Sequence, residues 1–143
     1  MATIKKSIKI NAPVEKVFEY AKNPEILPEI WPSLVEVKNI KELPNGGYSW
    51  DWEYKMAGMR FSGSSETTVA VPNERTVTLS TGGIESTITW EYQPVDDGTK
   101  LTVTTEYKVP IPLLGKLAES IIVKMNENEE EVILANLKAR MEA

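Results

Sequence analysis

The sequence of 143 residues contains no cysteine and no histidine. Without cysteine there is no disulfide framework and no thiolate nucleophile, and without histidine the commonest general base and the usual zinc ligands are missing. The glycine pairs 46–47 and 82–83 lack the following lysine and hydroxyl residue of a phosphate-binding loop, so they predict hairpin turns. The acidic run 126–131 is typical of an exposed helix face. We therefore expect no metal and no cofactor.

Positive charge is also scarce, with 16 Lys and Arg against 21 Asp and Glu. A net charge of -5 leaves no basic stripe for nucleic acid and no basic patch for an anionic membrane surface. No apolar run approaches the roughly 18 to 20 residues of a membrane span, and the N-terminal segment alternates instead of forming a signal peptide. We expect a soluble, cytoplasmic protein with no nucleic-acid partner and no stable membrane anchoring, folded as a single domain over residues 1–143.

Alternation of apolar and polar residues predicts strands over most of the chain. The clearest run is 48–56, in which Trp50, Trp52 and Tyr54 share one face. In another run, Val77, Leu79 and Thr81 are expected to point inward. Turn signals separate the predicted strands, which cover 3–11, 34–43, 48–56, 59–71, 77–81, 84–92 and 101–109. The last six follow one another closely and predict an antiparallel meander.

Helical spacing appears in three places. Pro13 and Asn23-Pro24 introduce two short helices after the first strand. From Pro110 to Met141 the chain predicts one long helix that packs across the sheet, with Leu117, Ile121, Met125 and Val132 facing the sheet and the acidic residues facing water. A coiled-coil arm is the alternative, although Asn128 and Glu129 interrupt a strict heptad.

This order of elements resembles the helix-grip fold of the START and pollen-allergen-like (SRPBCC) superfamily. Segments 8–18, 23–24, 31–33 and 112–117 are similar to its polyketide cyclase/dehydrase-type members. The resemblance implies an α+β fold in which a curved antiparallel sheet of about seven strands wraps a long C-terminal helix. The superfamily includes lipid and hormone binders, cyclases, quinone-binding proteins and chaperone activators, so the resemblance alone does not choose a function.

Strand parity places both aromatic rings and small residues on the concave face of the sheet. Small side chains cannot fill a wide concave surface, so we expect a cavity between the sheet and the long helix. The alternatives are plain core packing for the rings and ordinary strand propensity for the hydroxyls. The expected wall consists of Trp31, Trp50, Trp52, Tyr54, Phe61, Ser65, Thr67, Ile88, Trp90, Thr105, Tyr107, Leu117, Ile121, Met125 and Asn128.

The favoured function is binding, and with it transport or sequestration, of a hydrophobic small molecule such as a lipid, a quinone or a polycyclic, polyketide-like compound. The second hypothesis is a cyclase/dehydratase-type enzyme that uses Tyr54, Tyr92, Tyr107 or Arg60 for proton transfer. No inward carboxylate stands out, and a tyrosine with a pKa of about 10 is a poor base, so no catalytic residue is assigned.

The third hypothesis is an interaction module similar to the chaperone activators. Its candidate surface is Leu113-Leu114 beside Pro110-Ile111-Pro112, which alternatively forms a gate over the cavity mouth. Either a monomer or a homodimer formed through an edge strand fits the sequence.

Overall fold

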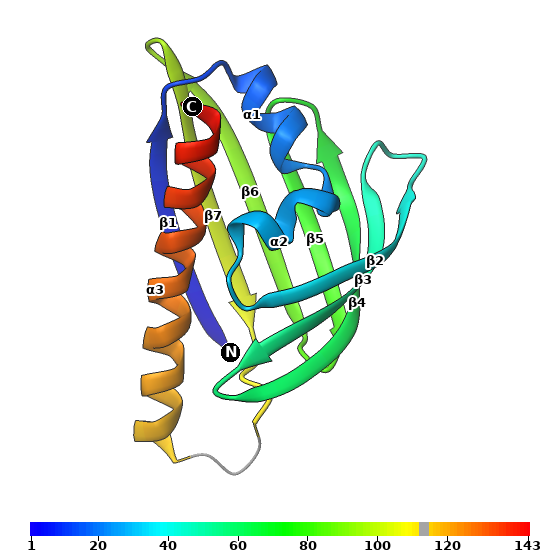
Figure 1. Cartoon of the computed structure of the whole chain (residues 1–143), viewed down its shortest axis with the longest axis vertical. Coiled ribbons are helices and arrows are strands. Elements are labelled where there is room, and N and C mark those ends of the chain that lie inside the picture. Colours follow the sequence, from blue (N-terminus) through cyan, green and yellow to red (C-terminus); the bar gives the residue numbers. More distant parts are fainter. Residues whose placement is uncertain (112–114) are drawn as a thin grey trace.

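A computed structural model describes residues 1–111 and 115–143. One strand, short helices, a run of consecutive strands and one long helix follow each other as the sequence predicts (Figure 1). The elements are β1 (Ala2–Ile10), α1 (Val14–Ala21), the 3-10 helix η1 (Pro24–Ile26), α2 (Leu27–Ile30), β2 (Leu34–Glu42), β3 (Tyr48–Met56), β4 (Met59–Val71), β5 (Arg75–Gly82), β6 (Ser86–Val95), β7 (Gly98–Tyr107) and α3 (Lys116–Met141).

The strands of the described chain form one antiparallel sheet in the order β1-β7-β6-β5-β4-β3-β2. Strands β2 to β7 are the predicted meander, and β1 closes the order by pairing with β7, with Ala2 opposite Tyr107. The sheet curves, with α1 and α2 over one end and α3 along the β1 side (Figure 1). The α+β helix-grip fold is confirmed.

Gly63 on β4 leaves room for the ring of Trp52 on the neighbouring strand β3. A Cβ atom at this position would overlap the ring of Trp52 and the carbonyl oxygen of Thr81. The absent side chain therefore fixes where the Trp52 indole lies on the concave face.

The short helices close one end of the sheet. Val17 and Phe18 of α1 are buried, and the Phe18 ring meets Tyr92 of β6 edge-on with 5.1 Å between centroids. Asn23 caps η1 as predicted, because its Oδ1 accepts a hydrogen bond from the Glu25 amide at 3.0 Å.

The predicted inward face of β5 is wrong. Leu79 is 43% exposed, and Thr76, Thr78 and Ser80 point to the concave side instead. A register shift between Thr67 and Val69 interrupts the pairing of β4 with β5. Strand β5 itself alternates without a break, and its Thr78 and Ser80 pair with Thr67 and Ser65 on the pocket face of β4, so Val77 and Leu79 lie on the outer face. An assignment that turns the apolar residues inward therefore chooses the wrong face of this strand.

The predicted inward face of the long helix is also wrong. Leu117, Ile121 and Met125 are 78%, 56% and 54% exposed, and Val132 is 44% exposed. The buried face consists of Ile122, Glu130, Ile133, Leu134, Leu137 and Met141. The apolar stripe chosen from the sequence is thus about one residue off the buried stripe, because the inward face becomes polar in mid-helix.

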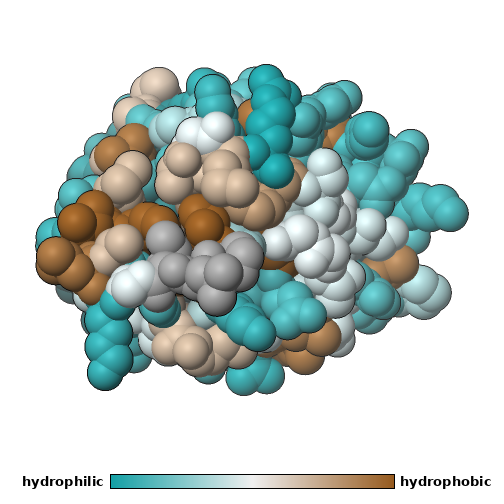
Figure 2. Space-filling model, turned by 90° about the horizontal axis from the view of Figure 1, so that it is seen from below, coloured by the Kyte–Doolittle hydropathy of each residue, from teal (hydrophilic) through white to brown (hydrophobic). Residues whose placement is uncertain are grey.

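Helix α3 begins at Lys116, later than the predicted start at Pro110. Within the predicted apolar surface or gate over residues 110–114, Pro112, Leu113 and Leu114 lie outside the described residues. Residues 116–121 are all exposed. Hydrophobic residues gather at the side of the molecule where α3 begins (Figure 2). None of the helices in ranges 1–111 and 115–143 is long and apolar enough to cross a membrane.

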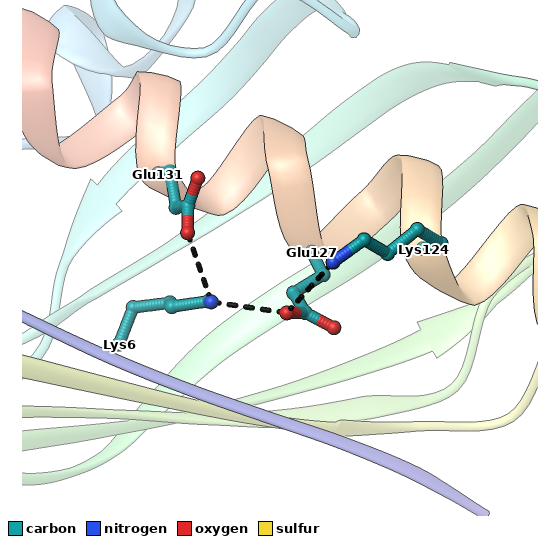
Figure 3. Close-up of polar contacts among 4 residues, drawn as sticks. All are labelled: Lys6, Lys124, Glu127 and Glu131. Atoms are coloured by element: carbon teal, nitrogen blue, oxygen red, sulfur yellow. Dashed lines mark hydrogen bonds and ion pairs between the residues drawn. The ribbon is translucent and has the colours of Figure 1, made fainter.

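Polar contacts fix the rotation of α3 about its axis. Lys6 of β1 reaches Glu127 at 3.0 Å and Glu131 at 2.9 Å (Figure 3). Asn136 donates a hydrogen bond to the carbonyl oxygen of Ile30 at 3.0 Å. Ion pairs between partly exposed side chains stabilise little, so these contacts orient a helix whose stability comes from apolar burial.

Candidate functional site

A pocket of about 150 Å³ lies between the concave face of the sheet and α3. Drug-sized ligands occupy sites of roughly 300 to 1,000 Å³, whereas an apolar cavity of about 150 Å³ holds benzene. In this conformation the pocket therefore matches a guest of one or two rings. Seven aromatic side chains contribute to its wall: Phe18, Trp31, Trp50, Trp52, Tyr54, Trp90 and Tyr107.

Most of the side chains expected on a cavity wall line this pocket. They come from the loop after α2 and from strands β3, β4, β6 and β7. These residues are Trp31, Trp50, Trp52, Tyr54, Ser65, Thr67, Ile88, Trp90, Thr105 and Tyr107.

Five expected wall residues lie elsewhere. Phe61 is partly buried and packs against the core without lining the pocket. Leu117, Ile121 and Met125 are exposed for the reason given above, and Asn128 is also exposed. Arg60, considered as a proton donor, pairs with Glu53 at 2.8 Å on the outer surface.

Small hydroxyl side chains line the part of the pocket formed by β4 and β5. Ser65 and Ser80 bond each other at 2.6 Å, and Thr76 and Thr78 lie on the same face of β5. One hydroxyl of the Ser65–Ser80 pair donates to the other, so each already has one hydrogen-bond partner without a guest.

Glu129 of α3 is the centre of a hydrogen-bonded cluster beside the pocket. Its Oε1 accepts from Trp31 Nε1 at 3.0 Å and from the Tyr54 hydroxyl at 2.6 Å, and its Oε2 accepts from Ser33. Burial and the neighbouring Glu129 carboxylate raise the pKa of Tyr54. Because it stays a protonated donor, Tyr54 holds α3 against β3 and the loop after α2.

Glu130, the next residue, is only 6% exposed. Its Oε1 accepts from Thr105 Oγ1 at 2.6 Å, while its Oε2 has no hydrogen-bond partner among the described residues. Burial raises the pKa of this carboxyl to about 7, although the Thr105 hydrogen bond and the Lys6 charge act in the opposite direction. Near neutral pH the Glu130 carboxyl therefore exists in both protonation states.

Two tyrosines differ in their relation to the pocket. Tyr107 lines it, and its hydroxyl accepts a hydrogen bond from Asn126 of α3 at 2.7 Å. Tyr92 is buried behind the wall, and its burial raises the pKa of its hydroxyl. Neither phenol is a base at neutral pH, since burial also raises the pKa of Tyr107.

The sequence prediction missed Asn126, Glu129 and Glu130, and its statement that no inward carboxylate stands out is wrong. A signal was present in the last turns of α3. The apolar positions Ile133 and Leu137, continued backwards in steps of three and four, lead to the polar residues at 130 and 126. Continuing the periodicity through polar residues would have placed them on the wall.

Comparison with known proteins identifies the family. The family model described as "Polyketide cyclase / dehydrase and lipid transport" matches residues 1–142. No curated protein sequence shows a significant match.

Solved structures share the fold. TTHA0849 from Thermus thermophilus superposes with a TM-score of 0.86 at 22% identity, covering 98% of this chain and 97% of that chain. The Zhui aromatase/cyclase from Streptomyces sp. R1128 superposes with a TM-score of 0.83 at 16% identity, covering 99% of this chain and 93% of that chain. A START superfamily protein from Mycobacterium smegmatis superposes with a TM-score of 0.81 at 16% identity, covering 98% of this chain and 97% of that chain. At these identities the likeness establishes the fold. With the family match over nearly its whole length, the chain belongs to the polyketide cyclase/dehydrase and lipid transport family.

Proposed function

We propose that this protein binds an apolar small molecule in the pocket between the sheet and α3. The observation that carries the proposal is the composition of the wall, in which indole and phenol rings surround a space. Two of the lining residues, Trp52 and Glu130, also carry buried polar atoms without partners among the described residues. An apolar surface with a few placed polar groups is the usual composition of a ligand site. The family description, which includes lipid transport, supports the same function.

The size of the pocket sets the expected affinity. A two-ring guest that buries about 200 Å² of apolar surface gains about 5 kcal/mol at roughly 25 cal/mol per Å². The loss of translational and rotational freedom offsets part of this gain, and stacking on the rings adds to it. We therefore expect dissociation constants from micromolar to millimolar for simple aromatic probes.

A filling mutation tests the proposal. Thr78 lines the pocket, so Thr78→Leu adds volume there, whereas Thr104 lies on the outer face of the sheet and Thr104→Leu is the matched control. The neutral two-ring probe 2-naphthol, titrated calorimetrically, should bind wild type and Thr104→Leu saturably at one site and bind Thr78→Leu at least about tenfold more weakly. Circular dichroism checks that both variants fold. Absence of saturable binding to wild type, or equal binding by Thr78→Leu, contradicts the proposal.

A second candidate function is an enzyme of the cyclase/dehydratase type. The specific observation in its favour is Glu130, a buried carboxyl on the pocket wall with a pKa of about 7. A group with this pKa can accept and return a proton at neutral pH, which aldol-type cyclisation and dehydration both require. In this reaction Glu130 Oε2 would take a proton from a carbon beside a carbonyl group and return it to the departing hydroxyl.

A chemical probe tests proton transfer without the native substrate. In 5-nitrobenzisoxazole, a base removes the ring C–H proton, the electron pair forms the nitrile, and the N–O bond breaks to leave a coloured phenolate. Wild type should accelerate this elimination with a rate that rises through a pH of about 7, and Glu130→Gln should lower the rate at least about tenfold. The neighbouring Glu131→Gln variant should keep the rate. A wild-type rate equal to buffer alone contradicts the enzymatic candidate.

A further inference from the structure

Two residues that line the pocket each carry a buried polar atom with no hydrogen-bond partner among the described residues: Oε2 of Glu130 and Nε1 of Trp52. The two residues are 6% and 7% exposed, so their side chains are almost fully removed from bulk solvent. Buried polar groups in native proteins are nearly always hydrogen-bonded. A guest that supplies partners to both atoms would remove this deficit, whereas a purely apolar guest would leave it in place.

The chemistry of the two atoms restricts the guest. The indole N–H of Trp52 can only donate, so the guest must offer an acceptor. Oε2 of Glu130 accepts a hydrogen bond when the carboxyl is ionised and can donate one when it is protonated. A hydroxyl group on the guest suits both states of Glu130 and also accepts from Trp52. An ammonium group cannot accept from Trp52, and a carboxylate cannot donate to Glu130.

The charges around the pocket point the same way. Glu129 and Glu130 both lie on the wall, and the cation among the described lining residues is Lys22, which pairs with Glu19 at 3.2 Å. Lys6 of β1, which also approaches this part of α3, is bonded to Glu127 and Glu131 instead (Figure 3). Within the part of the chain that the structure describes, an anionic guest would therefore meet the two wall carboxylates without a free cation to balance it.

We infer that the pocket selects an uncharged, hydroxylated aromatic molecule of one or two rings, which bonds Trp52 Nε1 and Glu130 Oε2, and that it rejects carboxylates. This inference rests on the proposed binding function and adds the polarity and charge of the ligand. It excludes free fatty acids and other organic acids as preferred guests.

A matched series of probes tests this selectivity. Naphthalene, 2-naphthol and 2-naphthoate share one ring system and differ in the polar group, and isothermal titration at pH 8 measures their affinities. Wild type should bind 2-naphthol at least about tenfold more tightly than either of the others, since a hydrogen bond to a charged group supports that factor. In Glu130→Gln the amide can donate to a carboxylate, so the preference for 2-naphthol over 2-naphthoate should shrink. Glu131→Gln on the outer face should keep it.

The outcomes separate the two proposals. Binding of naphthalene or 2-naphthoate as tightly as 2-naphthol overturns the inference and leaves the binding function intact. An undiminished preference for 2-naphthol in both Glu130→Gln and Trp52→Phe also overturns it, because the polar subsite would then lie elsewhere. If wild type binds none of the three probes, both proposals fail. The ratios measured on wild type keep the test decisive even where a variant does not fold.

Discussion

Replacing Glu130 with glutamine should change how the stability of the protein depends on pH. The ordinary pKa of this carboxyl, which applies to the unfolded chain, is 4.5, and in the folded protein burial raises its pKa to about 7. The folded state therefore binds the proton more tightly than the unfolded state. The stability linked to this group is present below pH 4.5 and is lost as the pH rises to about 7.

The magnitude follows from the difference between the two pKa values. Each unit is worth about 1.4 kcal/mol, so the shift corresponds to a loss of about 3 kcal/mol between pH 4.5 and pH 8. Lys6 from β1 favours the ionised form of Glu130 and Glu127 on α3 disfavours it. The pKa of about 7 already includes both effects. Thr105 and Tyr107 from β7 carry no charge in this range.

Urea denaturation of wild type and Glu130→Gln, followed by tryptophan fluorescence from pH 4.5 to pH 8, measures the effect. The free energy of unfolding of the variant minus that of wild type should rise by about 3 kcal/mol over this range, because all other titrations cancel in the difference. A flat difference for Glu130→Gln would refute the reasoning, since the carboxyl would then titrate at the same pH in both states.

Two further pairs of substitutions test the fold around the pocket. Gly63→Ala should destabilise the protein by about 2 kcal/mol or more and alter the fluorescence of Trp52, because the new Cβ would overlap the indole ring and the Thr81 carbonyl oxygen. In the control Gly115→Ala the new Cβ meets open space, so this variant should have little effect. Equal free energies of unfolding for the two variants would contradict this packing. Leu117→Lys should change the free energy of unfolding by less than about 0.5 kcal/mol because Leu117 is exposed, whereas Ile133→Lys should prevent folding because Ile133 is buried. A large loss of stability in Leu117→Lys would instead support the helix face expected from the sequence pattern.

Much of the fold could be predicted from the sequence because local rules and tertiary contacts agree there. Alternation along 48–56 identified β3 and its concave face. Trp50 and Trp52, which the alternation places on that face, are both buried in the structure. The cap at Asn23 and the turns between strands are likewise local features. These signals need no knowledge of what packs across the sheet.

The polar part of the site could not be predicted by the same rules. Hydrophobic periodicity assigns charged residues to solvent, but Glu129 is held by donors that lie far away in the sequence, at Trp31, Ser33 and Tyr54. Glu130 is held by Thr105 of β7. Such long-range partners stabilise inward carboxylates, so the true buried stripe of α3 contains a glutamate, and a more hydrophobic stripe remains exposed.

The location of a bound guest tests the central claim most directly. Methyl-labelled protein titrated with 2-naphthol reports contacts at each isoleucine and leucine by nuclear Overhauser effects. We expect contacts from the probe to Ile88 and Ile133, which line the pocket, and none to Leu117 or Ile121 on the exposed side of α3. Contacts confined to Leu117 and Ile121, with no effect at Ile88 and Ile133, would contradict a binding site between the sheet and the helix.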